Sequence, residues 1–142
     1  MQGLPSPTPM TSLWWSALAV GAGAALGAVL RWELGRWLNA LTPDVPAGTL
    51  VANLIGGFGV GVAIALFAHR PDWPPQWRLF LITGFLGGLT TFSTFSAEVI
   101  ALLQQGRWTL AAGAAVAHLG GSLLATFAGL AVAGWWLHRA PP

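Results

Sequence analysis

The chain has 142 residues, enough for one domain, and 55% of them are hydrophobic while only 7% are charged. Water-soluble domains rarely have this composition, so a membrane protein is expected. The absence of lysine and a net charge of only +2 argue against nucleic-acid binding, and the absence of cysteine excludes disulfides and cysteine-ligated metals.

Residues 1–11 are expected to form a disordered tail, because prolines alternate with serine and threonine there. No cleaved signal is expected, since no basic residue precedes the first apolar run. Residues 12–140 are expected to form a single domain of four transmembrane helices, each long enough to cross a bilayer. The expected spans are about 13–36, 47–68, 79–105 and 108–137.

The first span carries Gly23 and Gly27, whose spacing places two small residues on one helix face and favours close helix packing. Arg31 follows at the end of the apolar run. It is either an anchor that reaches the membrane surface or a functional cation facing a vestibule, and its position alone favours the anchor.

Asn53 is the one strongly polar residue of the second span. It either joins helices by hydrogen bonds or contacts a permeating species, and the sequence leaves these interpretations nearly even. The glycines that follow predict a close approach to another backbone. They are Gly56, Gly57, Gly59 and Gly61.

The third span contains the stretch GFLGGLTTFSTFSAE, residues 84–98, which is rich in glycine and hydroxyl side chains. Because both weaken a plain helix, we expect the third helix to be broken near Gly87 to Thr90. Broken backbone at membrane depth must be satisfied by protein or by a water-filled cavity. Carbonyl oxygens freed at the break could coordinate a small hard cation such as sodium.

After the expected break, Phe92 and Phe95 lie three positions apart and share a helix face. They are either core packing or, because ring edges carry partial positive charge, contacts for a small anion. Glu98 is an ionisable residue inside the span, and it is either functional or solvated near an interface. The sequence leaves its role open.

The fourth span carries His118, Ser122 and Thr126 at every fourth position, hence on one helix face. They could line a polar path, or the two hydroxyls could bond to their own helix backbone. His118 has no evident partner. A neighbouring stripe of small residues would admit another helix, and it comprises Ala117, Gly121, Ala125 and Gly129.

Four spans place both termini on one side of the membrane. The arginines then divide evenly between the two sides, so the positive-inside rule gives no preferred orientation. Insertion in both orientations permits an antiparallel homodimer. Arg70, Arg78 and Arg139 lie with the termini, and Arg31, Arg36 and Arg107 lie opposite.

The stretch at residues 84–98 resembles the signature of the CrcB/Fluc fluoride channels, and the match is long and specific. Gly27 to Trp32 resembles the family's first-helix G-A-x-x-R-aromatic pattern, and Gly48 to Gly56 resembles its second-helix G-T-x-x-x-N-x-x-G. The order and spacing of the four helices also agree. The resemblance therefore covers nearly the whole chain outside the tail.

The resemblance implies an all-α channel of the inner membrane, a dual-topology antiparallel homodimer in the lipid bilayer. Such a channel exports cytoplasmic fluoride passively through two pores and so relieves fluoride toxicity. The resemblance also implies a structural sodium ion at the dimer centre, held by the backbone carbonyls of Gly87 and Thr90. The residues it implies for the fluoride path are Arg31, Asn53, Phe92, Phe95, Ser122 and Thr126.

Two residues depart from the family pattern: Ala114 stands where an aromatic hydroxyl is common, and His118 where a small or hydroxyl residue is common. A rival class is the small dual-topology proton-coupled multidrug exporter, which needs a membrane-buried carboxylate; Glu98 is the one candidate. A structural subunit without transport activity would have no need of a hydroxyl-rich break. An enzyme is least expected, because no nucleophile, base and orienting group fall within one motif.

Overall fold

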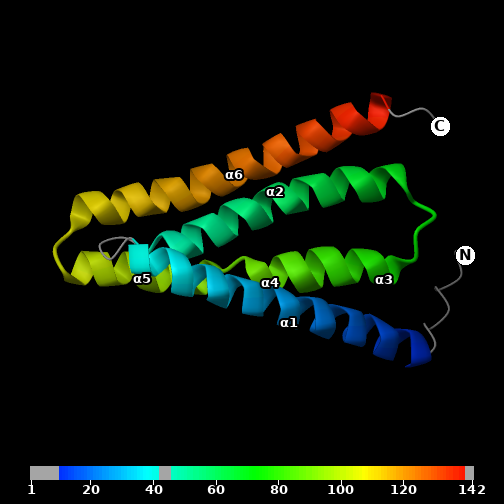
Figure 1. Cartoon of the computed structure of the whole chain (residues 1–142), viewed down its shortest axis with the longest axis horizontal. Helices are drawn as coiled ribbons and strands as arrows, with labels where there is room; N and C mark the ends of the chain where they lie inside the picture. The colour runs from blue at the N-terminus through cyan, green and yellow to red at the C-terminus, as the bar shows by residue number, and fades with distance from the viewer. Residues whose placement is uncertain (1–9, 42–45, 140–142) are drawn as a thin grey trace, which may run out of the picture.

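The computed structural model describes residues 10–41 and 46–139, and all regular structure in these ranges is helical. Three long helices are α1 (Met10–Leu41), α2 (Ala47–His69) and α6 (Trp108–Arg139) (Figure 1). Between α2 and α6 the chain forms shorter elements. These are α3 (Pro75–Arg78), the π-helix η1 (Leu79–Leu86), α4 (Gly87–Leu89) and α5 (Phe92–Gln104).

Four helical stretches are long and apolar enough to cross a membrane, which confirms the predicted number of spans. The first continues to Leu41 rather than ending near residue 36, because the next helix-breaking residue is Pro43. Asn39, which lies between the first two predicted spans, therefore belongs to α1. The stretches are Ser12–Leu41, Ala47–His69, Pro75–Gln104 and Trp108–Arg139.

The predicted disordered tail lies mostly outside the described residues, which begin at residue 10. Met10 and Thr11, assigned to the tail from the sequence, belong to α1. Residues 42–45, between the first two predicted spans, also lie outside the described residues.

The helices form a bundle in which α1 packs against η1 and α4, while α2 packs most extensively against α6. Figure 1 shows the first residues of α1 and the last residues of α6 at the same end of this bundle. This arrangement agrees with an even number of membrane crossings. It places α2 beside both α6 and the third crossing, so side chains of α2 can reach both.

Glycine allows the backbones to approach closely at both interfaces. A Cβ added to Gly27 would collide with the Phe85 carbonyl oxygen of η1, which confirms the predicted packing role of the first-span glycines. A Cβ on Gly57 of α2 would lie 2.9 Å from the Ser122 carbonyl oxygen of α6. On α6, a Cβ at Gly129 would collide with the α2 backbone, as the small-residue stripe predicted.

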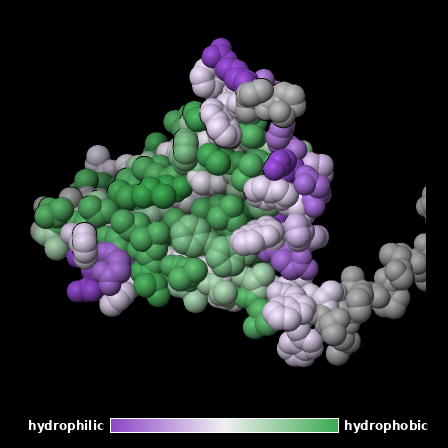
Figure 2. All heavy atoms as spheres, turned by 45° about the vertical axis from the view of Figure 1, so that its right-hand side comes forward, coloured by the Kyte–Doolittle hydropathy of each residue, from purple (hydrophilic) through white to green (hydrophobic). Residues whose placement is uncertain are grey.

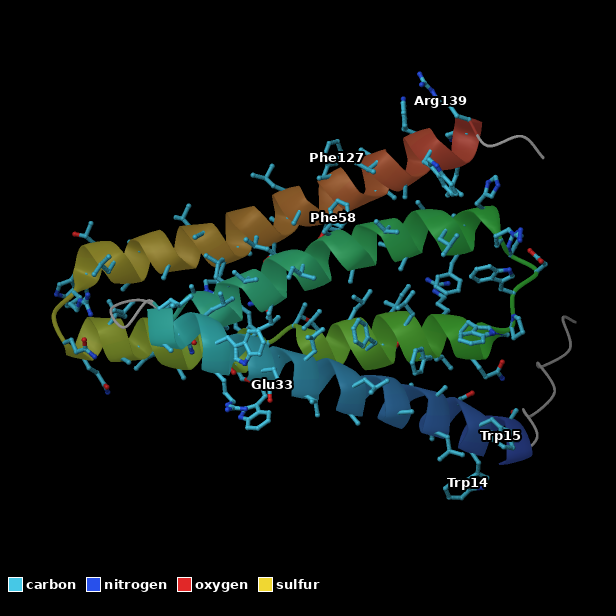
Figure 3. All side chains as sticks on the ribbon, in the orientation of Figure 1. Trp14, Trp15, Glu33, Phe58, Phe127 and Arg139 are labelled. Carbon is cyan, nitrogen blue, oxygen red and sulfur yellow. The ribbon has the colours of Figure 1, made fainter. Side chains whose placement is uncertain are left out.

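The surface is apolar across the middle of the face shown in Figure 2, and hydrophilic residues gather at the end where α6 finishes. Trp14 and Trp15 lie near that end on α1, and Arg139 lies there on α6 (Figure 3). The Arg139 guanidinium carbon sits 4.1 Å from the ring centroid of Trp135. Tryptophan and arginine are typical of the membrane–water interface, so this end of the bundle lies at one.

The packing at Gly27 can be tested with a matched glycine on the same helix. Replacing Gly27 by Ala forces a methyl group into the backbone of η1, and overpacking of this kind costs about 1–3 kcal/mol of stability. Gly21→Ala is the control, since nothing lies within 4 Å of a Cβ there. Thermal unfolding of the detergent-solubilised protein should show a lower midpoint for Gly27→Ala alone. Equal midpoints for both variants would contradict the packing described.

Candidate functional site

Thr90 and Thr91 are the non-helical residues between α4 and α5. Thr90 has φ −83° and ψ 152°, and Thr91 has φ −151° and ψ 121°, both in the extended region. The Thr90 N–H and hydroxyl still donate to the Leu86 carbonyl, at 3.0 and 2.9 Å. At Thr91 the helical hydrogen-bond ladder is interrupted before α5 begins at Phe92, so the Thr91 N–H needs another partner.

The Asn53 side chain, from α2, supplies that partner and also bonds to the Thr91 carbonyl. The Thr91 N–H donates to Asn53 Oδ1 at 2.8 Å, and Asn53 Nδ2 donates to the Thr91 carbonyl at 3.1 Å. Asn53 is only 8% exposed, and a buried amide is stable there because its hydrogen-bonding groups are used. Asn53 therefore joins two helices, one of the two roles that the sequence left open.

The hydroxyl side chains of Thr91, Ser93 and Thr94 form hydrogen bonds with one another and with the backbone at the start of α5. The Thr91 hydroxyl is the N-cap of that helix and accepts from the Thr94 N–H at 3.2 Å. The hydroxyls of Ser93 and Thr94 both lie 3.1 Å from the Thr91 hydroxyl. A capping hydroxyl of this kind contributes about 1 kcal/mol to helix stability.

Two backbone carbonyls lose their helical donors as a result. In a continuous helix the Gly87 carbonyl would accept from the Thr91 N–H, and the Thr90 carbonyl from the Thr94 N–H. Both N–H groups instead donate to side-chain oxygens. Carbonyl oxygens released in this way are suitable ligands for a hard cation, so the donor set fits the predicted sodium site.

Arg31, from α1, contacts the backbone of α4 next to the Gly87 carbonyl. Its Nε donates to the Gly88 carbonyl at 3.1 Å, which satisfies a third carbonyl whose helical donor is lost. Arg31 does not line the cavity that contains Asn53. Its role in attracting fluoride stays a prediction, whereas its contact with α4 is structural.

A cavity of about 290 Å³ opens beside the extended pair, between α2, α5 and α6. It brings together five of the six residues predicted for the fluoride path, all except Arg31. None of its lining residues is an arginine, lysine, aspartate or glutamate. The lining residues are Asn53, Gly57, Thr90, Thr91, Phe92, Phe95, His118, Leu119, Ser122, Leu123 and Thr126.

Aromatic rings form one wall of the cavity. Phe92 and Phe95 meet edge to face, with ring centroids 5.3 Å apart and planes at 71°. Phe95 stacks on the His118 ring at 4.6 Å and 23°. Phe92 is 75% exposed, so it lies at the open side of the cavity and does not pack in the core of a single chain.

Sequence reasoning missed the partner of His118. Its Nδ1 lies 3.1 Å from Asn53 Nδ2, and its side chain is buried. The two residues are 65 positions apart and meet because the glycines of α2 let α6 approach closely. The sequence did contain a signal for this contact. The second and fourth spans are both glycine-rich, and each carries one strongly polar residue, Asn53 and His118, which could pair if the two helices packed together.

A family model described as "CrcB-like protein, Camphor Resistance (CrcB)" matches residues 18–130. The chain belongs to the CrcB family. This confirms the resemblance seen in the sequence, and with four spanning-length helices it makes the chain a multi-pass membrane protein.

Several relatives of this CrcB-family chain carry the name "Fluoride-specific ion channel FluC". The protein of that name from Pseudomonas paraeruginosa is 61% identical over 127 residues, which cover 89% of this chain and 100% of that protein. The one from Pseudomonas aeruginosa is 59% identical with the same coverage. The one from Nitrosomonas europaea is 57% identical over 124 residues, or 87% of this chain and 98% of that protein.

Two further polar contacts in this CrcB-family chain answer questions left by the sequence. The Thr126 hydroxyl donates to the Ser122 carbonyl at 2.9 Å. This confirms, for Thr126, the predicted alternative that the hydroxyl bonds to its own helix backbone. Both residues nevertheless line the cavity. Glu98 accepts from the hydroxyl of Thr49, a buried residue of α2, at 2.5 Å, and neither residue lines the cavity. Thr49 was not singled out from the sequence.

Replacing Asn53 by Leu tests its role at the extended pair. The substitution leaves the Thr91 N–H without a partner and removes the amide contact to the Thr91 carbonyl, and a buried unpaired group costs about 1–3 kcal/mol. The unfolding midpoint of this CrcB-family protein in detergent should therefore fall clearly. Exposed Gln104→Leu on α5 serves as the control and should leave the midpoint unchanged. A stable Asn53→Leu variant would show that Thr91 is satisfied in another way.

Proposed function

We propose that the protein is a fluoride-selective channel of the inner membrane, through which cytoplasmic fluoride leaves passively and its toxicity is relieved. The observation that carries this proposal is the cavity without arginine, lysine or carboxylate in which hydroxyls, an imidazole and phenylalanine rings converge. The names of its relatives as fluoride-specific ion channels support the choice of ion.

The chemistry of the cavity suits a small, strongly hydrated anion. Such an ion gives up its water only where hydrogen-bond donors replace it, and the positive edges of aromatic rings add further favourable contacts. Conduction also requires that the ion is not held too tightly. Walls without an arginine, lysine or carboxylate meet that requirement, because they offer no charge that would trap or repel the anion.

The rival multidrug exporter lacks support from the same geometry. An exporter of cationic compounds needs a carboxylate that faces its substrate inside the membrane. Glu98 instead bonds to Thr49 and lies outside the cavity lining. The channel therefore remains the better account of the site.

An antiparallel homodimer would complete the cavity. One chain leaves Phe92 largely exposed, and the cavity volume of about 290 Å³ is many times the roughly 10–15 Å³ that one water needs. A second copy laid against this open side would narrow the path around the aromatic wall. The even division of arginines between the two ends supports insertion in both orientations.

Sodium would bind where the third membrane crossing is interrupted at Thr90 and Thr91. The Gly87 and Thr90 carbonyls, released from their helical donors, would hold it from each copy at the dimer centre. The ion would then link the two copies by its positive charge. Its role would be structural, since the phenylalanine-lined cavity lies on the side of Thr91 that faces α6.

Replacing Phe92 or Phe95 by Ile removes a ring edge and keeps an apolar side chain. If these rings contact the anion, fluoride efflux from proteoliposomes should fall roughly tenfold, the upper range for one aromatic contact. The wild-type protein should pass fluoride readily in the same assay.

Phe67→Ile is the matched control, because Phe67 also makes an edge-to-face pair, with Trp73, but lies outside the cavity. Its flux should equal that of the wild type. Unchanged flux in the Phe92 and Phe95 variants would assign these rings to packing, and a wild type without fluoride flux would overturn the proposed function.

Sodium removal tests the cation site. In buffer where N-methylglucamine replaces sodium, the dimer should dissociate or lose fluoride flux, since a bulky cation cannot occupy a cradle of carbonyl oxygens. Restoring sodium should restore both properties. Size-exclusion chromatography and efflux measure the outcome, and a fully active dimer without sodium would argue against the central ion.

A further inference from the structure

The orientation of the Asn53 amide follows from the backbone of Thr91. A backbone N–H can only donate, so the Asn53 atom 2.8 Å from the Thr91 nitrogen must be the oxygen Oδ1. The other terminal atom is therefore the amide nitrogen, which lies 3.1 Å from the Thr91 carbonyl. Oxygen and nitrogen are thus distinguished by their partners.

This orientation determines the protonation of His118. Asn53 Nδ2 is a donor, so the His118 Nδ1 at 3.1 Å must accept its hydrogen bond. The neutral ring then carries its proton on Nε2. An imidazolium, with protons on both nitrogens, would direct an N–H at the amide group and lose this bond.

Asn53 has no hydrogen-bond donor left for a ligand in this arrangement. Its amide nitrogen has two N–H bonds, and the two acceptors beside it are the Thr91 carbonyl and His118 Nδ1. An anion in the cavity therefore needs a donor other than Asn53.

His118 Nε2 is placed to be that donor. In the part of the chain that the structure describes, no buried side-chain nitrogen or oxygen lacks a partner. Nε2 makes no hydrogen bond there, so it must reach open space, and the space that His118 lines is the cavity. The Phe95 ring stacked at 4.6 Å and the bond from Asn53 hold the imidazole in this orientation.

We propose that His118 is an anion-contacting residue of the permeation path, donating a hydrogen bond from Nε2–H, while Asn53 acts as a positioning residue that sets its tautomer. The identity of the anion as fluoride rests on the proposed function. A neutral donor polarised by the chain from Thr91 through Asn53 attracts a small anion without the strong hold of a full positive charge.

Two substitutions separate the two nitrogens of His118. In His118→Gln the side-chain amide reaches about as far as Nε2, so a donor to the cavity is kept while the acceptor for Asn53 is lost. In His118→Asn the shorter amide lies near the position of Nδ1, so the acceptor for Asn53 is kept and the distal donor is lost. Size-exclusion chromatography establishes that each variant remains folded.

Fluoride efflux from proteoliposomes should stay within about threefold of wild type in His118→Gln and fall roughly tenfold to a hundredfold in His118→Asn, as expected for one hydrogen bond to an ion. The reverse order would make His118 a support for Asn53 only. Equal flux in the two variants, whether high or low, would also overturn the proposal.

Nitrogen NMR of the ¹⁵N-histidine-labelled protein in bilayers tests the contact without relying on conduction. The other two histidines, His69 and His138, are internal controls, and the His118→Gln variant assigns the His118 signals. We expect the Nε2–H tautomer and a shift of Nε2 on addition of fluoride that chloride does not produce. An imidazolium, an Nδ1–H tautomer or no response to fluoride would contradict the proposal.

The two experiments distinguish failure of this inference from failure of the proposed function. A wild type that passes no fluoride, but whose Nε2 signal shifts with fluoride, would leave an anion site in a protein that is not a channel. A wild type that conducts fluoride with an unresponsive Nε2 would be a channel whose anion contact lies elsewhere.

Discussion

The pairing of the Asn53 side chain with both backbone groups of Thr91 is the interaction on which the rest of the site depends. Extended backbone inside a membrane is stable only when its polar groups have partners, and one amide from α2 accepts from the Thr91 N–H and donates to the Thr91 carbonyl. The same pairing withdraws the Thr91 N–H from the Gly87 carbonyl. On its other side it directs an amide N–H at the His118 ring.

The two non-helical threonines connect two kinds of ion chemistry. Carbonyl oxygens, which suit a cation, are released on the α4 side, where Arg31 satisfies a third carbonyl. Hydrogen-bond donors and aromatic edges, which suit an anion, converge on the α6 side. The glycines of α2 make this possible because α6 can approach within backbone contact of Gly57 and Gly61. One interruption of a helix could thus serve both a structural cation and a permeating anion.

Patterns along the chain predicted what depends on neighbouring positions. Hydropathy predicted the four spans, and the spacing of Gly23 and Gly27 predicted a packing face that the structure confirms. Pairings between distant positions lay beyond this reasoning, because they depend on how the helices are arranged in space. The bond from Thr49 to Glu98 joins residues 49 positions apart, and the contact of Arg31 with Gly88 joins residues 57 apart. The π-helix η1 also has no simple signal in an apolar run.

Selectivity between halides tests the central claim most directly, because the donors and ring edges of the cavity are argued to replace the water of a small anion. The measurement is the efflux of fluoride and of chloride from matched proteoliposomes that contain the wild-type protein in sodium buffer. The account predicts rapid fluoride efflux and chloride efflux near that of protein-free liposomes. Comparable efflux of the two ions would contradict it.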